Sequence, residues 1–164
     1  MQTGKDIMLP QHNGFSYFKN STLDDMQFLA PRLRYEDKQE ILSLVGLAPL
    51  QAMLLSYKTS ETCYTIFNPK DAPVGAFGVT SNGAIWMLAT NDIVEIQIPF
   101  LKQCRDIVDF YNTKHPLLWN VVDCRNKLHI KWLDWCGFTF ISKRKIGVLN
   151  KDFYEFVKLC ATQL

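Results

Sequence analysis

The chain has 164 residues, of which 48% are hydrophobic and 21% charged, and its formal net charge is +2. These values are typical of a soluble globular protein, and the length predicts one domain, residues 1–164, with a single continuous core. The near balance of charge excludes a strongly basic nucleic-acid-binding protein, and we find no clear nucleic-acid or membrane signal.

The five cysteines are odd in number and include no Cys-Xaa-Xaa-Cys pair. We therefore expect neither a disulfide framework nor a bound metal. Met1–Pro10 lacks the apolar stretch of a signal peptide. Ala72–Asn91 carries no charge over a length that could span a bilayer, but Thr80–Gly83 divides it into two halves of strand length. The expectation is a protein that is neither secreted nor membrane-spanning.

The N-terminal part of the chain predicts one short strand followed by helices. Asp24 and Asp25 place carboxylates in the first turn of the first helix, where the helix dipole favours them. Gly46 follows the second helix, as is common at helix ends. The predicted segments are a strand at Phe15–Phe18, a helix capped by Ser21 or Thr22 and ended by Pro31, a helix at Glu36–Val45, and a helical turn or two at Pro49–Ser56.

The middle of the chain predicts a three-stranded meander. Thr62–Phe67, Val74–Val79 and Ala84–Ala89 are short runs rich in residues that favour strands. Asn82-Gly83 lies between the last two runs and favours a tight hairpin, because both residues accept a positive φ.

The C-terminal part alternates helices and strands. Leu128, Trp132 and Trp135 recur on one face of a helix at Lys127–Cys136. Because helices separate the strands after about residue 90, we expect at least one parallel strand pair. The predicted elements are a helix at Ile98–Asn112, a buried strand at Leu117–Val122, the helix at Lys127–Cys136, a strand at Phe138–Ile141, and a strand or short helix at Phe153–Leu159.

The unit from Leu117 to Phe140 resembles the C-terminal half of the GNAT N-acetyltransferase superfamily. The resemblance rests on the turn residue Asn126 followed by Gly137-Phe138, and on an element order that matches the GNAT topology across nearly the whole chain. It implies an α/β fold with a mixed, twisted sheet of about six or seven strands flanked by about four helices. It also implies acetyl-CoA as cofactor, with the pantetheine arm contacted by Met87, Leu88, Ala89, Thr90 and Asn126.

Three segments resemble more narrowly the small GNAT-like proteins of podoviruses, some of which are regarded as internal virion proteins. They are Arg34–Ile41, Ile85–Thr90 and Leu118–Asp123, together with Asn126 and Trp132-Leu133. This resemblance implies a bacteriophage protein located in the virion or the host cytoplasm, with a phage or host protein as partner.

The sequence departs from the family pattern where coenzyme A should bind. Family members carry an Arg/Gln-Xaa-Xaa-Gly-Xaa-Gly/Ala loop for the diphosphate, whereas residues 90–99 contain no glycine, arginine or lysine and include Asp92 and Glu95. These carboxylates would repel a diphosphate. Arg125 or Lys127 could offset that repulsion. The loop nevertheless argues against tight binding of acetyl-CoA.

The family's catalytic acid is also missing. Many members have a tyrosine seven residues after the turn asparagine, and here that position is Leu133, which cannot transfer a proton. Tyr154 and Cys136 are alternatives that nothing in the sequence places. Glu95 and Asp92 are weak candidates for the catalytic base, and the sequence favours the alternative that both are solvated loop carboxylates.

Two further groups of residues have two interpretations each. Asn126 is either the N-cap of the helix that follows it or a coenzyme contact, and the same side chain can do both. Arg34, Asp37 and Glu40 share one helix face that borders the acceptor site in GNAT proteins. They form either a surface for a charged acceptor or partner, or an internally paired set.

We therefore predict a phage-encoded, GNAT-fold, acyltransferase-like protein with a role in the virion, in assembly or in other binding, and with weak or absent acetyl transfer. The alternative is an active acetyl-CoA-dependent N-acetyltransferase that modifies an amine of a phage or host acceptor. Fold alone does not decide between the two.

Overall fold

The computed structural model describes residues 17–161, which form seven strands, five α-helices and two short 3-10 helices. The strands are β1 (Tyr17–Asn20), β2 (Ser60–Phe67), β3 (Pro73–Thr80), β4 (Ile85–Ala89), β5 (Leu117–Asp123), β6 (Thr139–Ile146) and β7 (Lys151–Leu159). The helices are α1 (Leu23–Leu29), η1 (Ala30–Arg32), α2 (Tyr35–Val45), α3 (Pro49–Thr59), η2 (Asn91–Ile96), α4 (Gln97–Lys114) and α5 (Lys127–Trp135).

The predicted α/β fold is confirmed, and most elements lie within a few residues of their expected bounds. The first predicted strand is confirmed only for Tyr17 and Phe18, because Phe15 and Ser16 lie outside the described residues, as does Met1–Pro10. The last segment is a strand and not a helix.

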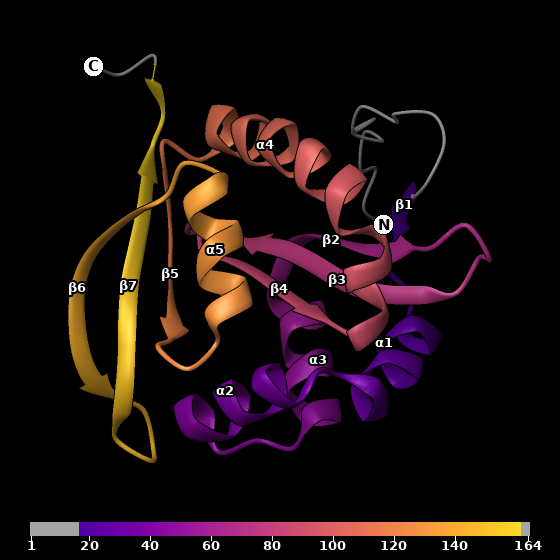
Figure 1. Ribbon diagram of the computed structural model, residues 1–164, viewed down its shortest axis with the longest axis horizontal. Coiled ribbons are helices and arrows are strands. Elements are labelled where there is room, and N and C mark those ends of the chain that lie inside the picture. The colour runs from indigo at the N-terminus through magenta and orange to yellow at the C-terminus, as the bar shows by residue number, and fades with distance from the viewer. Residues whose placement is uncertain (1–16, 162–164) are drawn as a thin grey trace.

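The strands form two antiparallel sheets, in the orders β1-β2-β3-β4 and β5-β7-β6. The expected parallel pair is reduced to one isolated bridge, in which Ala84 meets Trp119 at the junction of β4 and β5. In Figure 1 the second sheet stands at the left, and its strands run at a steep angle to β3 and β4. The two sheets thus touch at one corner and diverge from it.

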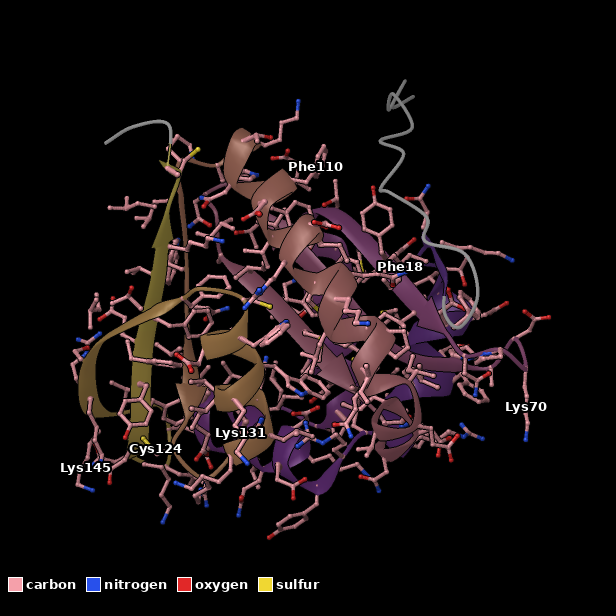
Figure 2. All side chains as sticks on the ribbon, turned by 45° about the horizontal axis from the view of Figure 1, so that its top comes forward. Phe18, Lys70, Phe110, Cys124, Lys131 and Lys145 are labelled. Atoms are coloured by element: carbon pink, nitrogen blue, oxygen red, sulfur yellow. The ribbon has the colours of Figure 1, made fainter. Side chains whose placement is uncertain are left out.

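Helices cover both faces of the first sheet. In Figure 1, α4 lies above β3 and β4, and α1, α2 and α3 lie below them. One apolar cluster lies between the strands and the helices α4 and α5, and it includes Phe77, Phe100 and Trp132. A second, smaller cluster lies between the first sheet and α1–α3 and includes Met26, Leu29 and Met53. Side chains fill the interior between the helices and the strands (Figure 2).

Two helix ends match their sequence signals. Thr22 and Asp25 form a reciprocal capping box at the start of α1, which satisfies two backbone donors of its first turn. Gly46 ends α2 in the left-handed region, at φ 68°.

Other expectations are corrected. In the β3–β4 turn only Gly83 has a positive φ; Asn82 does not. Trp135 was expected on the inner face of α5, but its side chain is 44% exposed and stacks on the Arg105 guanidinium. Its position at the end of the short helix lets it reach across to α4, where its indole donates to the Leu101 carbonyl oxygen.

Among residues 17–161 no single helix is long and apolar enough to cross a membrane, and only α2 and α3 taken together, with a 75° bend between them, meet that test of length and composition. All five cysteines are free thiols.

Gly83 holds the junction between the two sheets. Its carbonyl oxygen accepts a hydrogen bond from the Trp119 amide at 3.1 Å, and the neighbouring Asn82 carbonyl accepts one from the Trp119 indole. A Cβ atom at Gly83 would stand 2.3 Å from the Leu117 carbonyl oxygen. The junction therefore leaves no room for a side chain.

We predict that Gly83→Ala lowers the free energy of unfolding by at least about 3 kcal/mol, because it adds a backbone clash to the strain of a positive φ. Gly137→Ala is the matched control. Gly137 has nearly the same φ, 87°, but a Cβ there would meet only the flexible Lys158 amine at 3.5 Å. It should cost about 1–2 kcal/mol. Urea denaturation measures both values, and equal losses would contradict the proposed close packing.

Candidate functional site

The candidate site lies where β4 and β5 separate. The two strands are joined near their first residues, where the Asn120 side chain donates to the Ile85 carbonyl oxygen at 2.8 Å. At their last residues they are linked only indirectly, through four side chains that we call the interstrand network. Its members are Arg34, Asp37, Glu40 and Asn126.

Asn126 is the centre of the network and is completely buried. Its carboxamide oxygen accepts a hydrogen bond from the Arg34 guanidinium at 3.2 Å. Its amide nitrogen donates to Asp37 at 3.0 Å and to Glu40 at 3.3 Å. Asn126 is the N-cap residue of α5, as its place before the helix suggests, but its side chain makes no capping hydrogen bond. Both ends of the carboxamide are engaged inside the protein.

Asp37 connects the network to the edge of β4. One carboxylate oxygen accepts the Ala89 amide at 3.0 Å, and the other accepts from Asn126 and, at 3.5 Å, from Arg34. The backbone just before α2 lies along the same edge, because the Arg34 amide donates to the Ala89 carbonyl oxygen at 2.8 Å and Leu33 bridges Thr90. The last residues of β4 are therefore paired with the chain that enters α2.

Glu40 is the network member that faces a cavity. Its Oε2 accepts the Asp123 amide at 2.9 Å and the Asn126 amide, while no described residue donates to Oε1. Burial, followed by the nearby Asp37 charge, raises the pKa of Glu40 to about 8, although the two hydrogen bonds to the carboxylate oppose the shift. Glu40 is thus mainly protonated at neutral pH.

The cavity has a volume of about 250 Å³ and passes between the two sheets. Residues of α2, α3 and β4 line one part of it, and residues of α4, α5 and β5 line the other. Most of its wall is apolar. The side chains with polar groups that line it are those of Glu40, Ser56, Asn120 and His129, with the indoles of Trp86 and Trp132 and the thiols of Cys104 and Cys136.

His129 lies one turn after Asn126 on α5 and also lines the cavity. Its imidazole makes no hydrogen bond with any residue in the described range. Burial lowers the pKa of His129, and the Asp37 charge partly opposes this. The ring is therefore neutral at pH 7 and presents a nitrogen donor and a nitrogen acceptor beside the network.

Solved structures share this architecture. A spermidine N-acetyltransferase from Vibrio cholerae, in complex with CoA and spermine, matches with a TM-score of 0.62 at 11% identity, over 88% of this chain and 95% of that one. A ribosomal-protein-S5-alanine acetyltransferase from Vibrio fischeri matches with a TM-score of 0.62 at 11% identity, over 92% and 96%. No family profile and no curated protein sequence matches the chain.

The chain has the GNAT acetyltransferase fold. The expectation from Asn126, Gly137-Phe138 and the order of elements is therefore confirmed at the level of fold. At this sequence identity the likeness does not extend to residues that bind or react, so the site must be judged from its own side chains.

The residues present do not fit a coenzyme A arm bound along β4. Of the four consecutive residues expected to contact it, Ala89 donates its amide to Asp37, Thr90 donates its amide to Val74, and the register directs the Leu88 amide toward β3. Only the Met87 amide faces the gap without a partner among the described residues. Asn126, the fifth expected contact, is enclosed by the network.

The segment after β4 does not fit the diphosphate either. It forms η2, in which Thr90 accepts the Asp92 amide through its side chain and the Ile93 amide through its carbonyl oxygen. The Asp92 and Ile93 amides are thus already used, where a phosphate site needs such amides free. Arg125 and Lys127 were the two cations that could offset the repulsion of a diphosphate by Asp92 and Glu95. Arg125 binds Asp123 and Ser43, and Lys127 is exposed.

The candidate catalytic carboxylates are not in the cavity. Asp92 and Glu95 are exposed on η2, and neither lines the cavity wall. Leu133 does line it, at the position where an acid was expected, and so does Cys136. Tyr154 does not, because its ring packs against Phe140 in the second sheet. Glu40 and His129 are the titratable carboxyl and imidazole of the wall.

Of the two interpretations of Arg34, Asp37 and Glu40, internal pairing is the one that the geometry supports. Arg34 and Asp37 are buried, and an open surface for a partner is not formed there. Their role toward an acceptor stays a prediction. In the described part of the chain, no group of three or more histidine, cysteine or acidic side chains is placed to hold a metal ion.

Glu40 gives stability a specific pH dependence. Its pKa is about 8 when folded against a usual 4.5. Between these values the folded state keeps a proton that the unfolded state releases, so the stabilisation is complete below about pH 4.5 and is lost as pH rises through about 8. Between these pH values the free energy of unfolding should fall by up to about 1.4 kcal/mol per pH unit because of Glu40, and we predict that Glu40→Gln abolishes this contribution. Chemical denaturation of both proteins at pH 5, 7 and 9 measures the difference, and parallel curves would contradict it.

Proposed function

We propose that this GNAT-fold protein acts by binding and that it transfers acetyl groups from coenzyme A weakly or not at all. The main support is the interstrand network. Asn126 is buried with its carboxamide fully engaged, and Asp37 occupies the Ala89 amide. A coenzyme arm along β4 would have to break these bonds, and it would leave the carboxylate of Asp37 without its partners in the interior, which costs several kcal/mol.

We propose further that the setting is that of a bacteriophage, in the virion or the host cytoplasm, with a phage or host protein as partner. The support is the resemblance of Arg34–Ile41, Ile85–Thr90 and Leu118–Asp123 to the small GNAT-like proteins of podoviruses. Since Arg34 and Asp37 are buried, the partner would bind outside that face.

The alternative function, acetyl-CoA-dependent transfer to an amine, has one observation in its favour. Glu40 lines a cavity that passes between β4 and β5, and a carboxyl with a pKa of about 8 can accept a proton from an amine once the pH rises above that value. This function requires the Leu33–Asp37 segment to leave the edge of β4 before the coenzyme binds.

Calorimetric titration with acetyl-CoA tests the proposal, and we expect no saturable heat. In a parallel thermal denaturation we expect no rise in melting temperature, whereas a ligand at about a hundred times its dissociation constant would add about 2.7 kcal/mol. A saturable shift that free coenzyme A competes away would overturn the proposal.

An acetyl-transfer assay with a panel of amines completes the test. The proposal predicts transfer that is absent or only slightly above the uncatalysed rate and that does not change in Glu40→Gln. The alternative predicts transfer that increases as pH rises through about 8, because Glu40 must lose its proton to act as a base, and that is absent in Glu40→Gln.

A further inference from the structure

We propose that the cavity between β4 and β5 binds an uncharged aliphatic molecule that ends in a hydroxyl or carbonyl oxygen. The inference rests on the proposed function, in which the protein acts by binding and coenzyme A does not fill this space. It adds the chemical class of the ligand, argued from the size of the cavity, its wall, its polar end and its opening.

The size of the cavity suits a small organic molecule. Its volume is about 250 Å³. An apolar cavity of roughly 150 Å³ stays dry and holds a benzene molecule, so the present one has room for a longer aliphatic chain. Its wall supports the same conclusion, because it contains large apolar side chains such as Leu88, Phe100 and Ile107.

The polar groups of the wall favour a ligand with one hydrogen-bonding end. Glu40 Oε1 and the His129 imidazole have no hydrogen-bond partner among the described residues, and Asp37 lies close enough to both to act on their ionisation. Asn120 is a weaker candidate because its own hydrogen bonds already use it. Asn120 already uses its amide on Ile85 and its oxygen on the Val121 amide.

The charges around the cavity favour an uncharged ligand. No lysine or arginine lines it, so a carboxylate or phosphate would find no cation. Arg34 is paired with Asp37, and Arg125 is paired with Asp123 at 2.6 Å. Each of these two arginines is thus already paired with an aspartate, and Glu40 forms no ion pair with either of them. Kept neutral by burial, it can donate its proton to a hydroxyl or carbonyl oxygen.

The cavity opens between α2 and α3. Val45 on α2 and Leu55 on α3 belong to its wall, yet they are 47% and 51% exposed. Ser56 lies beside Leu55 and is half-buried. A ligand could therefore enter with its apolar part last, without passing the interstrand network.

Fluorescence titration of the full chain with aliphatic alcohols tests the proposal, because Trp86 and Trp132 line the cavity. At pH 7 we expect a saturable change with 1-octanol. From butanol to hexanol to octanol the affinity should rise by about fourfold per added methylene. Octylamine and octanoate should bind at least about tenfold more weakly than octanol, because each brings a charge into an apolar wall.

A matched pair of variants locates the site. Ala52 is buried in the cavity wall, and Ala48 is exposed just before α3 and outside it. Ala52→Met should weaken octanol binding by about tenfold, since it fills the space, and Ala48→Met should leave it unchanged. If Ala52→Met lowers the melting temperature too far for a titration, Ser56→Leu at the opening serves the same purpose.

Three outcomes would overturn the inference: no saturable change with octanol, equal losses in the Ala52 and Ala48 variants, or tighter binding of octylamine or octanoate than of octanol at pH 7. Titration with acetyl-CoA separates this inference from the proposed function. Acetyl-CoA that binds and displaces octanol would overturn the proposed function, while an octanol failure without acetyl-CoA binding would overturn the cavity ligand alone.

Discussion

The hydrogen bonds of the Asn126 carboxamide determine how the two halves of this fold meet. They join the start of α5 to Arg34, the residue before α2, and to Asp37 and Glu40 within α2, and Asp37 carries the connection to the Ala89 amide at the end of β4. Three elements that are distant in the sequence thereby depend on one buried side chain. The interior solvates unpaired charges poorly. Removing any one member would therefore leave the remaining side chains buried without a partner, which lowers the free energy of unfolding.

The same network closes the edge of β4 but leaves a cavity between β4 and β5. A strand edge that offers backbone groups can hold an extended ligand, and a gap between strands can enclose its apolar end. Here the edge is paired at Ala89 and Thr90, whereas the gap remains as a cavity beside Met87 and Glu40. The structure thus has the cavity without an exposed strand edge, and this combination is the observation on which the proposed binding function rests.

The sequence predicts the elements well and the site poorly, for physical reasons. Periodic apolar residues and turn signals act over a few positions, so α4 and Gly137 were predictable. The pairing of Arg34 with Asn126 joins residues 92 positions apart, which no local pattern contains. Charged residues are usually exposed, so Asp37 and Glu40 were as compatible with a surface as with an interior. His129 carried no usable signal, because its role depends on the wall that surrounds it.

Amide hydrogen exchange at the edge of β4 tests the central claim most directly. The Ala89 amide donates to Asp37 at 3.0 Å, while the Met87 amide faces the same gap without a partner among the described residues. We predict that Ala89 exchanges as slowly as Leu88, whose amide is paired within the sheet, that Met87 exchanges much faster, and that acetyl-CoA changes neither rate. Exchange at Ala89 as fast as at Met87, with protection of both on addition of acetyl-CoA, would show an open edge and contradict the account.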